Sequence, residues 1–457
     1  MTDTPGTPPT TPPSDALPLG STPRFVTRAF DVPGIDRIAV YRANGGYAAL
    51  AKAFEQFQPD ALLDEVKRSG LRGRGGAGFA TGMKWGFLPA NNPKPRYLCV
   101  NADESEPGTF KDRMIMEVCP HLLVEGTIIS SYATNVHHAF IYIRGELPLA
   151  EQQMSRAVRE AYAVGLLGKN ILGSGFDLDI TVHRGAGAYI CGEESALLES
   201  LEGKRGYPRL KPPFPAVVGL YSSPTVINNV ETIATVPAVV EHGAEVYAAY
   251  GTERSKGTRI YCLSGHVERP GNYELPLGIP LRTLIEDYGG GVRNGRQIKA
   301  IIPGGSSTPF LMPSQLDTPL DYESVAAAGS MLGSGGVVVL DDQTCIVGAV
   351  LRMTEFYRDE SCGKCTPCRE GTFWLVQLLE RLEEGHGKES DIPLLADICD
   401  NMLGRCFCPL GDAATMSITS SIKLFYDEYL HHITAHGCLV GPRARGVAVA
   451  AHAHAHA

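Results

Sequence analysis

Residues 70–85 read GLRGRGGAGFATGMKW, and this stretch decides how the rest of the chain is interpreted. Six of the sixteen residues are glycine, which lets a ligand approach the backbone closely. Cations beside exposed backbone N–H groups favour phosphate, and the stretch supplies three: Arg72, Arg74 and Lys84. Phe79, Trp85 and the following Phe87 could stack on a flat ring. The stretch therefore predicts a site for a nucleotide-type cofactor.

Two familiar phosphate-binding motifs do not describe this loop. The spacing Gly73-x-Gly75-x-x-Gly78 matches the dinucleotide fingerprint, which should follow a strand and open a helix. The preceding residues 61–70 instead have helical periodicity, which argues against a Rossmann turn. Lys84 follows no glycine directly and precedes no Ser or Thr, so the loop is not a Walker A motif. The remaining alternative is a flexible glycine loop without a ligand.

Length and composition indicate a soluble protein of several domains. The chain has 457 residues, of which 44% are hydrophobic and 20% charged. Its net charge of −9 argues against a general nucleic-acid binder, and no apolar run is long enough to span a membrane. Residues 1–23 are rich in Thr, Pro and Ser, have no signal-peptide core, and are predicted to be disordered. Twelve cysteines without an export signal indicate a reducing compartment.

The region from about residue 95 to 200 predicts an α/β domain with a largely parallel sheet, because strand and helix patterns alternate there. The expected strands are 95–100, 139–143 and 176–182, and the expected helices are 121–135 and 149–165.

Polar side chains follow the first of these strands. In open α/β sheets, ligands bind beyond the carboxyl ends of the strands. Carboxylates and amides there can accept hydrogen bonds from ribose hydroxyls or flavin N–H groups. An acidic turn before a helix is the alternative. The candidates are Asn101, Asp103, Glu104 and Glu106.

Two later segments add candidate ligands. Gly192, Glu193 and Glu194 form a turn before a helix, where paired glutamates could accept hydrogen bonds in a pocket or simply favour the helix start. Asn228 and Asn229 could bind phosphate or fix a turn. A rigid basic loop, residues 203–219, could clamp a second nucleotide. Residues 258–311 then have the pattern of a small ubiquitin-like β-grasp domain, and 337–340 read as a strand before the final domain.

The cysteine run at residues 361–370, SCGKCTPCRE, is the most specific chemical signal in the chain. Cys362, Cys365 and Cys368 have the spacing that holds three irons of a [4Fe–4S] cluster, with zinc as the competing metal. The fourth ligand should be distant, and Cys408, which precedes a proline, and Cys406 are candidates. The C-terminal domain is predicted to be a helical bundle around the cluster. The other cysteines are predicted to be structural: Cys99, Cys119, Cys191, Cys262, Cys345, Cys399 and Cys438.

Four stretches together resemble one family. They are GLRGRGGAGFATGMKW, NADESEPGTFKDR, the segment from GAGAYICGEESALLESLEG to INNVET, and SCGKCTPCREGT with the later Cys408. Over residues 30–435 the chain resembles the NADH-binding flavoprotein subunit of bacterial respiratory complex I. The same core occurs in diaphorase subunits of NAD-linked hydrogenases and formate dehydrogenases, which are the alternative, and a non-enzymatic metal-binding scaffold is a third possibility.

The resemblance implies FMN, a [4Fe–4S] cluster and NADH as substrate, with no catalytic acid, base or nucleophile. Glu194 and Glu106 would tune affinity through their charge. FMN contacts would come from Gly73, Arg74, Gly76, Lys84, Asn101, Asp103, Glu104, Gly192, Glu193, Glu194, Asn228 and Asn229. NADH contacts would come from Phe79, Phe87, Glu106, Lys211 and Phe214. The cluster ligands would be Cys362, Cys365, Cys368 and Cys408. Cys406 departs from the usual small hydroxylic residue and could compete with Cys408.

The resemblance also implies an organisation and an assembly. We expect a disordered extension (1–25), an FMN- and NADH-binding α/β domain (26–255), a β-grasp domain (256–336), a helical [4Fe–4S] domain (337–438) and a disordered His/Ala tail (439–457). The expected partners are other complex I subunits, notably a thioredoxin-like [2Fe–2S] subunit and the large iron–sulfur subunit. Contact with the membrane would come only through partner subunits, at the cytoplasmic face of the bacterial plasma membrane.

Overall fold

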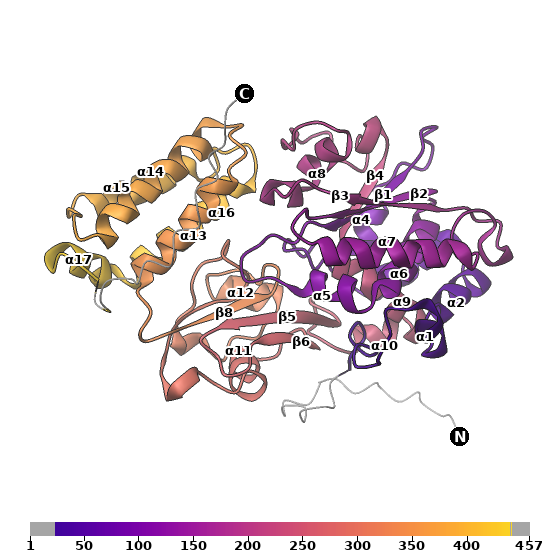
Figure 1. Ribbon diagram of the computed structural model, residues 1–457, viewed down its shortest axis with the longest axis horizontal. Coiled ribbons are helices and arrows are strands. Elements are labelled where there is room, and N and C mark those ends of the chain that lie inside the picture. The colour runs from indigo at the N-terminus through magenta and orange to yellow at the C-terminus, as the bar shows by residue number, and fades with distance from the viewer. Residues whose placement is uncertain (1–22, 439, 441–457) are drawn as a thin grey trace, which may run out of the picture.

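A computed structural model describes residues 23–438 and 440 of the chain. Three parts surround one central region (Figure 1): an α/β domain, a second sheet with short helices, and a C-terminal group of long helices. The Pro/Thr-rich extension through residue 22 and the tail from residue 441 lie outside the described residues. Phe25, expected in the extension, is instead buried against Tyr247 and Tyr250.

The first sheet is parallel throughout, as the sequence predicted. It consists of β1 (Tyr97–Ala102), β2 (His138–Ile143), β3 (Asp179–Arg184) and β4 (Thr225–Asn229), in the order β3-β2-β1-β4. In this register Asn101 of β1 lies opposite Asn229 of β4. Because parallel strands end at the same edge, the polar residues that follow β1 and those that close β4 meet there.

Helices pack with this sheet around the largest hydrophobic core. The helix α6 (Pro120–Thr134) is buried along nearly its whole length, and it packs against α9 (Val230–His242). The other helices of the domain are α1 (Ile38–Ala43), α2 (Ala48–Gln56), α3 (Pro59–Arg68), α4 (Thr81–Trp85), α5 (Lys111–Val118), α7 (Pro148–Ala163), α8 (Glu194–Leu201) and α10 (Ala244–Ala248). The glycine loop therefore follows a helix, α3, and not a strand, which removes the Rossmann interpretation.

The second sheet has the order β6-β5-β8-β7. Its strands are β5 (Thr258–Gly265), β6 (Gly271–Pro276), β7 (Ile298–Ile302) and β8 (Gly336–Asp341), with the short helices α11 (Leu281–Thr283) and α12 (Tyr322–Ala327). The strand β8 is an inner strand, parallel to β5 and antiparallel to β7. The sequence had assigned this strand to the last domain, but the second sheet extends through Asp341.

The C-terminal part is helical, as predicted, and begins with a helix that the sequence analysis had not assigned. This is α13 (Ile346–Glu360), followed by α14 (Thr366–Glu383), α15 (Asp391–Met402), α16 (Pro409–Leu424) and α17 (Tyr426–Thr434). These helices share a hydrophobic core with β1, β2, α8 and β7. The shared core fixes the cysteine-bearing helix ends beside the carboxyl edge of the first sheet. Among the described helices, none is long and apolar enough to cross a membrane.

Candidate functional site

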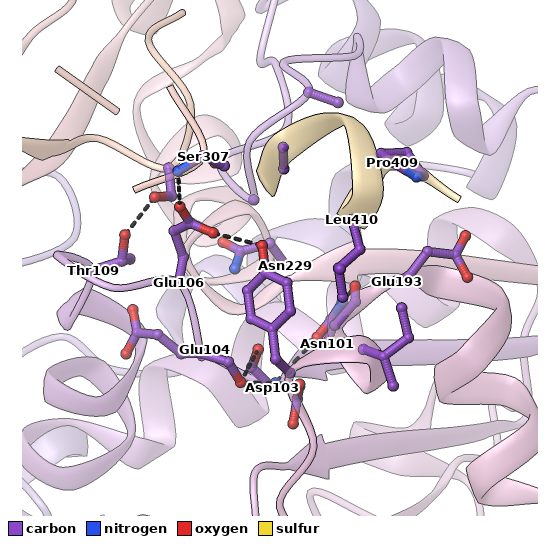
Figure 2. Close-up of a pocket in the computed structure, with 18 of the residues that line it drawn as sticks. Asn101, Asp103, Glu104, Glu106, Thr109, Glu193, Asn229, Ser307, Pro409 and Leu410 are labelled. Carbon is purple, nitrogen blue, oxygen red and sulfur yellow. Dashed lines mark hydrogen bonds between the residues drawn. The ribbon is translucent and has the colours of Figure 1, made fainter. Parts of the chain in front are cut away.

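A cavity of about 540 Å³ lies where the three parts meet (Figure 2), within the size range of small-molecule sites. Four segments line it: the glycine loop, the residues after β1, the turn before α8, and the start of α16. The sequence-predicted residues among the lining are Arg74, Asn101, Asp103, Glu104, Glu106, Gly192, Glu193, Asn229 and Cys408. The predicted FMN contacts outside the lining are Gly73, Gly76, Lys84, Glu194 and Asn228.

The glycine loop is a tight hairpin held by the second sheet's domain. Gly73 N–H donates to the carbonyl of Phe79 across 2.7 Å, and Tyr322 of α12 donates its hydroxyl to the carbonyl of Gly73 across 2.7 Å. Gly78 has φ +64°, and a Cβ there would lie 2.5 Å from the Tyr322 ring. Only glycine suits this position, so the loop owes its shape to a residue far away in the sequence.

The cations of the loop do not all face a ligand. The Arg74 guanidinium is fully buried and donates to the Tyr247 hydroxyl at 2.9 Å and to the Thr258 carbonyl at 2.8 Å. Arg72 pairs with Glu323 at 2.6 Å. Trp85 is also buried, and its indole N–H donates to Asn228 Oδ1 at 2.8 Å. Arg72, Arg74 and Trp85 therefore hold the loop in place, and the backbone is the part that remains for an anionic ligand.

Asp103 carries the clearest sign of a missing hydrogen-bond donor. Its Oδ2 accepts from the Ser105 hydroxyl at 3.1 Å, but its buried Oδ1 has no hydrogen-bond partner among the described residues. Burial raises the pKa of Asp103 to about 7. A buried acceptor beside a cavity needs a donor from a ligand, and the ring N–H of a flavin is one of suitable chemistry. The residues present therefore fit FMN.

Glu104 has a structural contact that the sequence did not reveal. Its carboxylate accepts from the backbone N–H groups of Lys111, Asp112 and Arg113, at 2.8–2.9 Å, and so caps the start of α5. Burial, followed by the nearby Asp112, raises the pKa of Glu104.

Behind this cap lies a buried charge network. Lys111 Nζ contacts Asp112 at 2.8 Å and Glu231 at 2.9 Å, and it donates to Asn229 Oδ1 at 3.3 Å. Asn229 in turn donates to Asp112 at 2.6 Å and caps α9. Asn229 thus joins the ends of β4 and β1 at the cavity floor.

Glu106 connects all three parts of the molecule. Tyr189 donates its hydroxyl to Glu106 Oε2 at 2.7 Å, while the Ser307 N–H and the Ser306 hydroxyl donate to Oε1 at 2.7 and 3.2 Å (Figure 2). Ser306 also bonds the hydroxyl of Tyr357 in α13, at 2.9 Å. The carboxylate of Glu106 is therefore engaged by protein donors.

A second charged group sits at the turn before α8. Lys84 pairs with Glu194 at 2.9 Å, and Lys211 pairs with Glu194 at 2.9 Å and with Glu193 at 2.7 Å. Burial acts to raise the pKa of Glu194, but the two lysines outweigh it and hold the pKa below its usual range. The other oxygen of Glu193 caps α8 through Ser195 and Ala196. The lysines predicted to contact FMN and NADH thus lie together, paired with these glutamates.

The predicted adenine-stacking rings are exposed. Phe79 and Phe87 lie with ring centroids 5.9 Å apart and are about half exposed, and Phe214 is 58% exposed. Exposed aromatic side chains beside a cavity are available to stack on a planar ligand.

The cysteine run lies on the other side of the cavity wall. Cys365 caps α14 and Cys368 stands in its first turn, while Cys408 caps α16, which contacts α14. The Phe407 N–H donates to Cys365 Sγ at 3.4 Å. A donor set of several neighbouring thiols suits a [4Fe–4S] cluster.

The structure brings both candidates for the fourth ligand to this run. Cys406 lies beside Cys365 and Cys368, and Cys408 lies beside Cys362 and Cys368. Cys408 also lines the cavity, whereas the Cys406 sulfur packs against Gly411 of α16. Cys408 as the fourth ligand remains a prediction, and its position between cavity and cysteines favours it.

The sequence analysis missed part of the lining. These residues are Ser105, Thr109, Lys111, Asp112, Tyr189, Ile190, Ser307, Met331, Ser334 and the start of α16 through Met416. Lys111 and Asp112 stand inside the quoted stretch NADESEPGTFKDR, so the clustering of charge there was the available signal. The others come from segments distant in sequence.

Comparison with known proteins decides the family. Residues 66–238 match the Nuo51 FMN-binding domain, 348–432 match the NADH-ubiquinone oxidoreductase-F iron-sulfur binding region, and 260–311 match the SLBB domain. The chain is 58% identical over 425 residues to the NADH-quinone oxidoreductase F subunit of Mycobacterium tuberculosis, covering 92% of this chain and 95% of the relative. This chain belongs to the family of NADH-quinone oxidoreductase F subunits.

Other F subunits are similarly close. The one of Streptomyces coelicolor is 59% identical over 403 residues, covering 88% of this chain and 89% of the relative. The F subunit numbered 2 of Rhizobium meliloti is 54% identical over 411 residues, covering 90% and 98%. The expected fold, with an FMN-binding α/β domain, a β-grasp-type second domain and a C-terminal iron–sulfur region, is thereby confirmed.

A solved NAD+-reducing [NiFe]-hydrogenase has the same fold, with a TM-score of 0.75 and 37% identity. The match covers 84% of this chain and 64% of the hydrogenase chain. The chain thus spans just under two thirds of that relative, and its identity to the hydrogenase is well below its identity to the quinone-linked subunits.

Proposed function

We propose that this chain is the NADH-oxidising subunit of an NADH:quinone oxidoreductase, with FMN and NADH in the cavity and a [4Fe–4S] cluster on the neighbouring cysteines. The observation that carries the proposal is the shared wall: Cys408 lines the same cavity as Asp103 and Gly192. A flavin site and a cluster site that share one residue can exchange electrons without a further carrier in this chain.

The bound groups supply the redox chemistry: FMN accepts the hydride of NADH and gives up electrons singly, and the cluster takes one electron at a time. The chain's own residues bind and orient them. The unpartnered Oδ1 of Asp103 would accept a flavin N–H, and the backbone of the glycine loop would hold the phosphate. No side chain has to donate or remove a proton for hydride transfer.

The walls of the cavity would keep water from the reduced flavin. Leu410, Ala413 and Met416 of α16 form an apolar side opposite the polar strand ends (Figure 2). Phe79, Phe87 and Phe214 would stack with the adenine of NADH, and Lys211 would meet its charged part. Glu106 would act on NADH binding chiefly by holding Tyr189 and the loop of Ser307 in place.

The assembly part of the proposal rests on the family. The relatives are named as one subunit of a larger oxidoreductase, so this chain works with other subunits. We propose the thioredoxin-like [2Fe–2S] subunit and the large iron–sulfur subunit as direct partners, at the cytoplasmic face of the plasma membrane. The diaphorase alternative is less well supported, because the hydrogenase match has 37% identity against 58–59% for the quinone-linked subunits.

The test is the visible spectrum of the purified full chain before and after NADH. We expect flavin and iron–sulfur absorbance that NADH bleaches anaerobically, together with an EPR signal of a reduced [4Fe–4S] cluster. A colourless protein that binds zinc at these cysteines would overturn the proposal. Co-purification with a soluble nickel–iron subunit, in place of membrane subunits, would support the diaphorase alternative.

A further inference from the structure

Four potential metal ligands meet at the end of the C-terminal helices that is remote from the cysteine run. Cys345 caps α13, Glu383 is the last residue of α14, His432 lies in the last turn of α17, and Cys438 follows α17. One ligand atom from each lies within 4.8 Å of the others. The sequence analysis had predicted Cys345 and Cys438 to be isolated, which is wrong.

The distances among these atoms are those of a tetrahedral site. Cys345 Sγ lies 3.4 Å from His432 Nε2 and 3.5 Å from a Glu383 carboxylate oxygen, and these nitrogen and oxygen atoms are 3.3 Å apart. Zinc bonds of about 2.3 Å to sulfur and about 2.0–2.2 Å to nitrogen and oxygen would place tetrahedral ligands about 3.4–3.6 Å apart. Each of the three separations is thus within about 0.2 Å of a zinc tetrahedron.

The surroundings orient two of the ligands. His432 is fully buried, and its Nδ1 lies 2.8 Å from the Glu428 carbonyl oxygen. A hydrogen bond from Nδ1–H to that oxygen would leave the Nε2 lone pair pointing at the other ligands, as in most zinc-binding histidines. Cys345 Sγ accepts the Gly348 N–H at 3.2 Å, at the start of α13, where the helix dipole favours a thiolate.

The segment that carries Cys438 is also held in place. His436 Nδ1 lies 3.1 Å from the Gly385 carbonyl oxygen, and Gly387 packs close to Ile433. The turn after α14 and the turn after α17 therefore pack on each other. Cys438 is brought to the site by these contacts and by no feature of its local sequence.

We propose that Cys345, Glu383, His432 and Cys438 bind a structural Zn²⁺ ion. Two thiolates, an imidazole and a carboxylate suit zinc, and four protein ligands make a closed, non-catalytic site. The site is separate from the iron–sulfur region, because the 15 residues of α13 between them span about 22 Å. Its role is to fasten α17 and the chain after it to the α13–α14 pair.

The first experiment measures zinc in the wild-type full chain, purified without chelator, alongside a variant in which the tail histidines His452, His454 and His456 are alanine. We expect about one zinc per chain in both, with a zinc K-edge EXAFS spectrum showing two sulfur neighbours at about 2.3 Å and two nitrogen or oxygen neighbours. Zinc that disappears with the tail histidines, zinc with only nitrogen and oxygen neighbours, or no zinc would each overturn the proposal.

The second experiment uses Cys438→Ser with Cys399→Ser as the matched control. Cys399 lies buried in α15, outside the four-ligand group, so its substitution should leave the zinc content unchanged while Cys438→Ser loses the bound ion. Equal zinc in the two variants would overturn the proposal. Peptide mapping of the wild type adds a further check: a Cys345–Cys438 disulfide in protein kept under reducing conditions is incompatible with a zinc site. Should Cys438→Ser fail to fold, the wild-type EXAFS spectrum still decides.

Discussion

Asn101 Nδ2 donates a hydrogen bond to the backbone carbonyl of Gly192 across 2.8 Å, and so ties the end of β1 to the turn before α8. The Oδ1 of the same side chain accepts the Asp103 N–H at 3.1 Å. One amide therefore sets the spacing between two walls of the cavity. This arrangement needs both a donor and an acceptor, which explains why an amide stands where a carboxylate would satisfy only one of them.

Replacing Asn101 with alanine should weaken FMN binding. The variant leaves a buried carbonyl and N–H without partners, which costs about 1–2 kcal/mol and corresponds to an FMN dissociation constant about 5- to 30-fold higher. Fluorescence titration of the FMN-free chain measures it. Asn401→Ala is the control, since that amide is exposed on α15. Equal affinities for the two variants would contradict the role given to Asn101.

Asp103 should make the stability of the FMN-free chain depend on pH. Its folded-state pKa of about 7 lies above the unfolded value near 3.9, so the folded state binds the extra proton between these values. Raising the pH through this window therefore destabilises the chain, by at most about 4 kcal/mol at full deprotonation.

The measurement for Asp103 is the free energy of unfolding in urea at several pH values, for wild type and Asp103→Asn. The variant should gain on the wild type between about pH 4 and pH 7, and the gain should level off above that window. A difference that is independent of pH would mean that Asp103 titrates normally.

The sequence predicted those parts of the site that lie within one short segment. The acids after β1 could be found because a buried strand ends in polar residues, and Cys362, Cys365 and Cys368 because their spacing is itself the signal. The parallel sheet followed from alternating periodicities, which are local as well.

The sequence could not predict what distant contacts decide. Tyr322 reaches Gly73 across 249 residues, and Ser307 reaches Glu106 across 201. The Glu104 cap depends on α5 starting at Lys111, a boundary without a strong local signal. Placing Cys345 beside Cys438 required the packing of three helices, so these two cysteines were taken for isolated core residues.

Gly78→Ala should distort the glycine loop and lower FMN occupancy. Alanine would need φ near +64°, and its methyl would stand 2.5 Å from the Tyr322 ring. Gly295→Ala is the matched control, because Gly295 has φ +66° and a Cβ there meets no other described atom within 4 Å. Both variants should lose about 1 kcal/mol of stability from the backbone alone.

The two glycine variants therefore differ only at Tyr322. We expect flavin release to show the difference, with substoichiometric FMN in purified Gly78→Ala and full FMN in Gly295→Ala. Full FMN in both would show that the loop tolerates a displaced Tyr322 and that its hairpin shape is not needed for the cofactor.

The final prediction separates the two candidates for the fourth cluster ligand. Cys408→Ser should abolish or strongly alter the EPR signal of the NADH-reduced [4Fe–4S] cluster, because the serine replaces a thiolate at the cavity wall. Cys406→Ser should keep the signal, since that sulfur packs against Gly411 and is expected to serve as packing alone. FMN content provides the internal control, because both variants retain Asp103 and the glycine loop. An unchanged signal in Cys408→Ser together with a lost signal in Cys406→Ser would transfer the ligand assignment to Cys406.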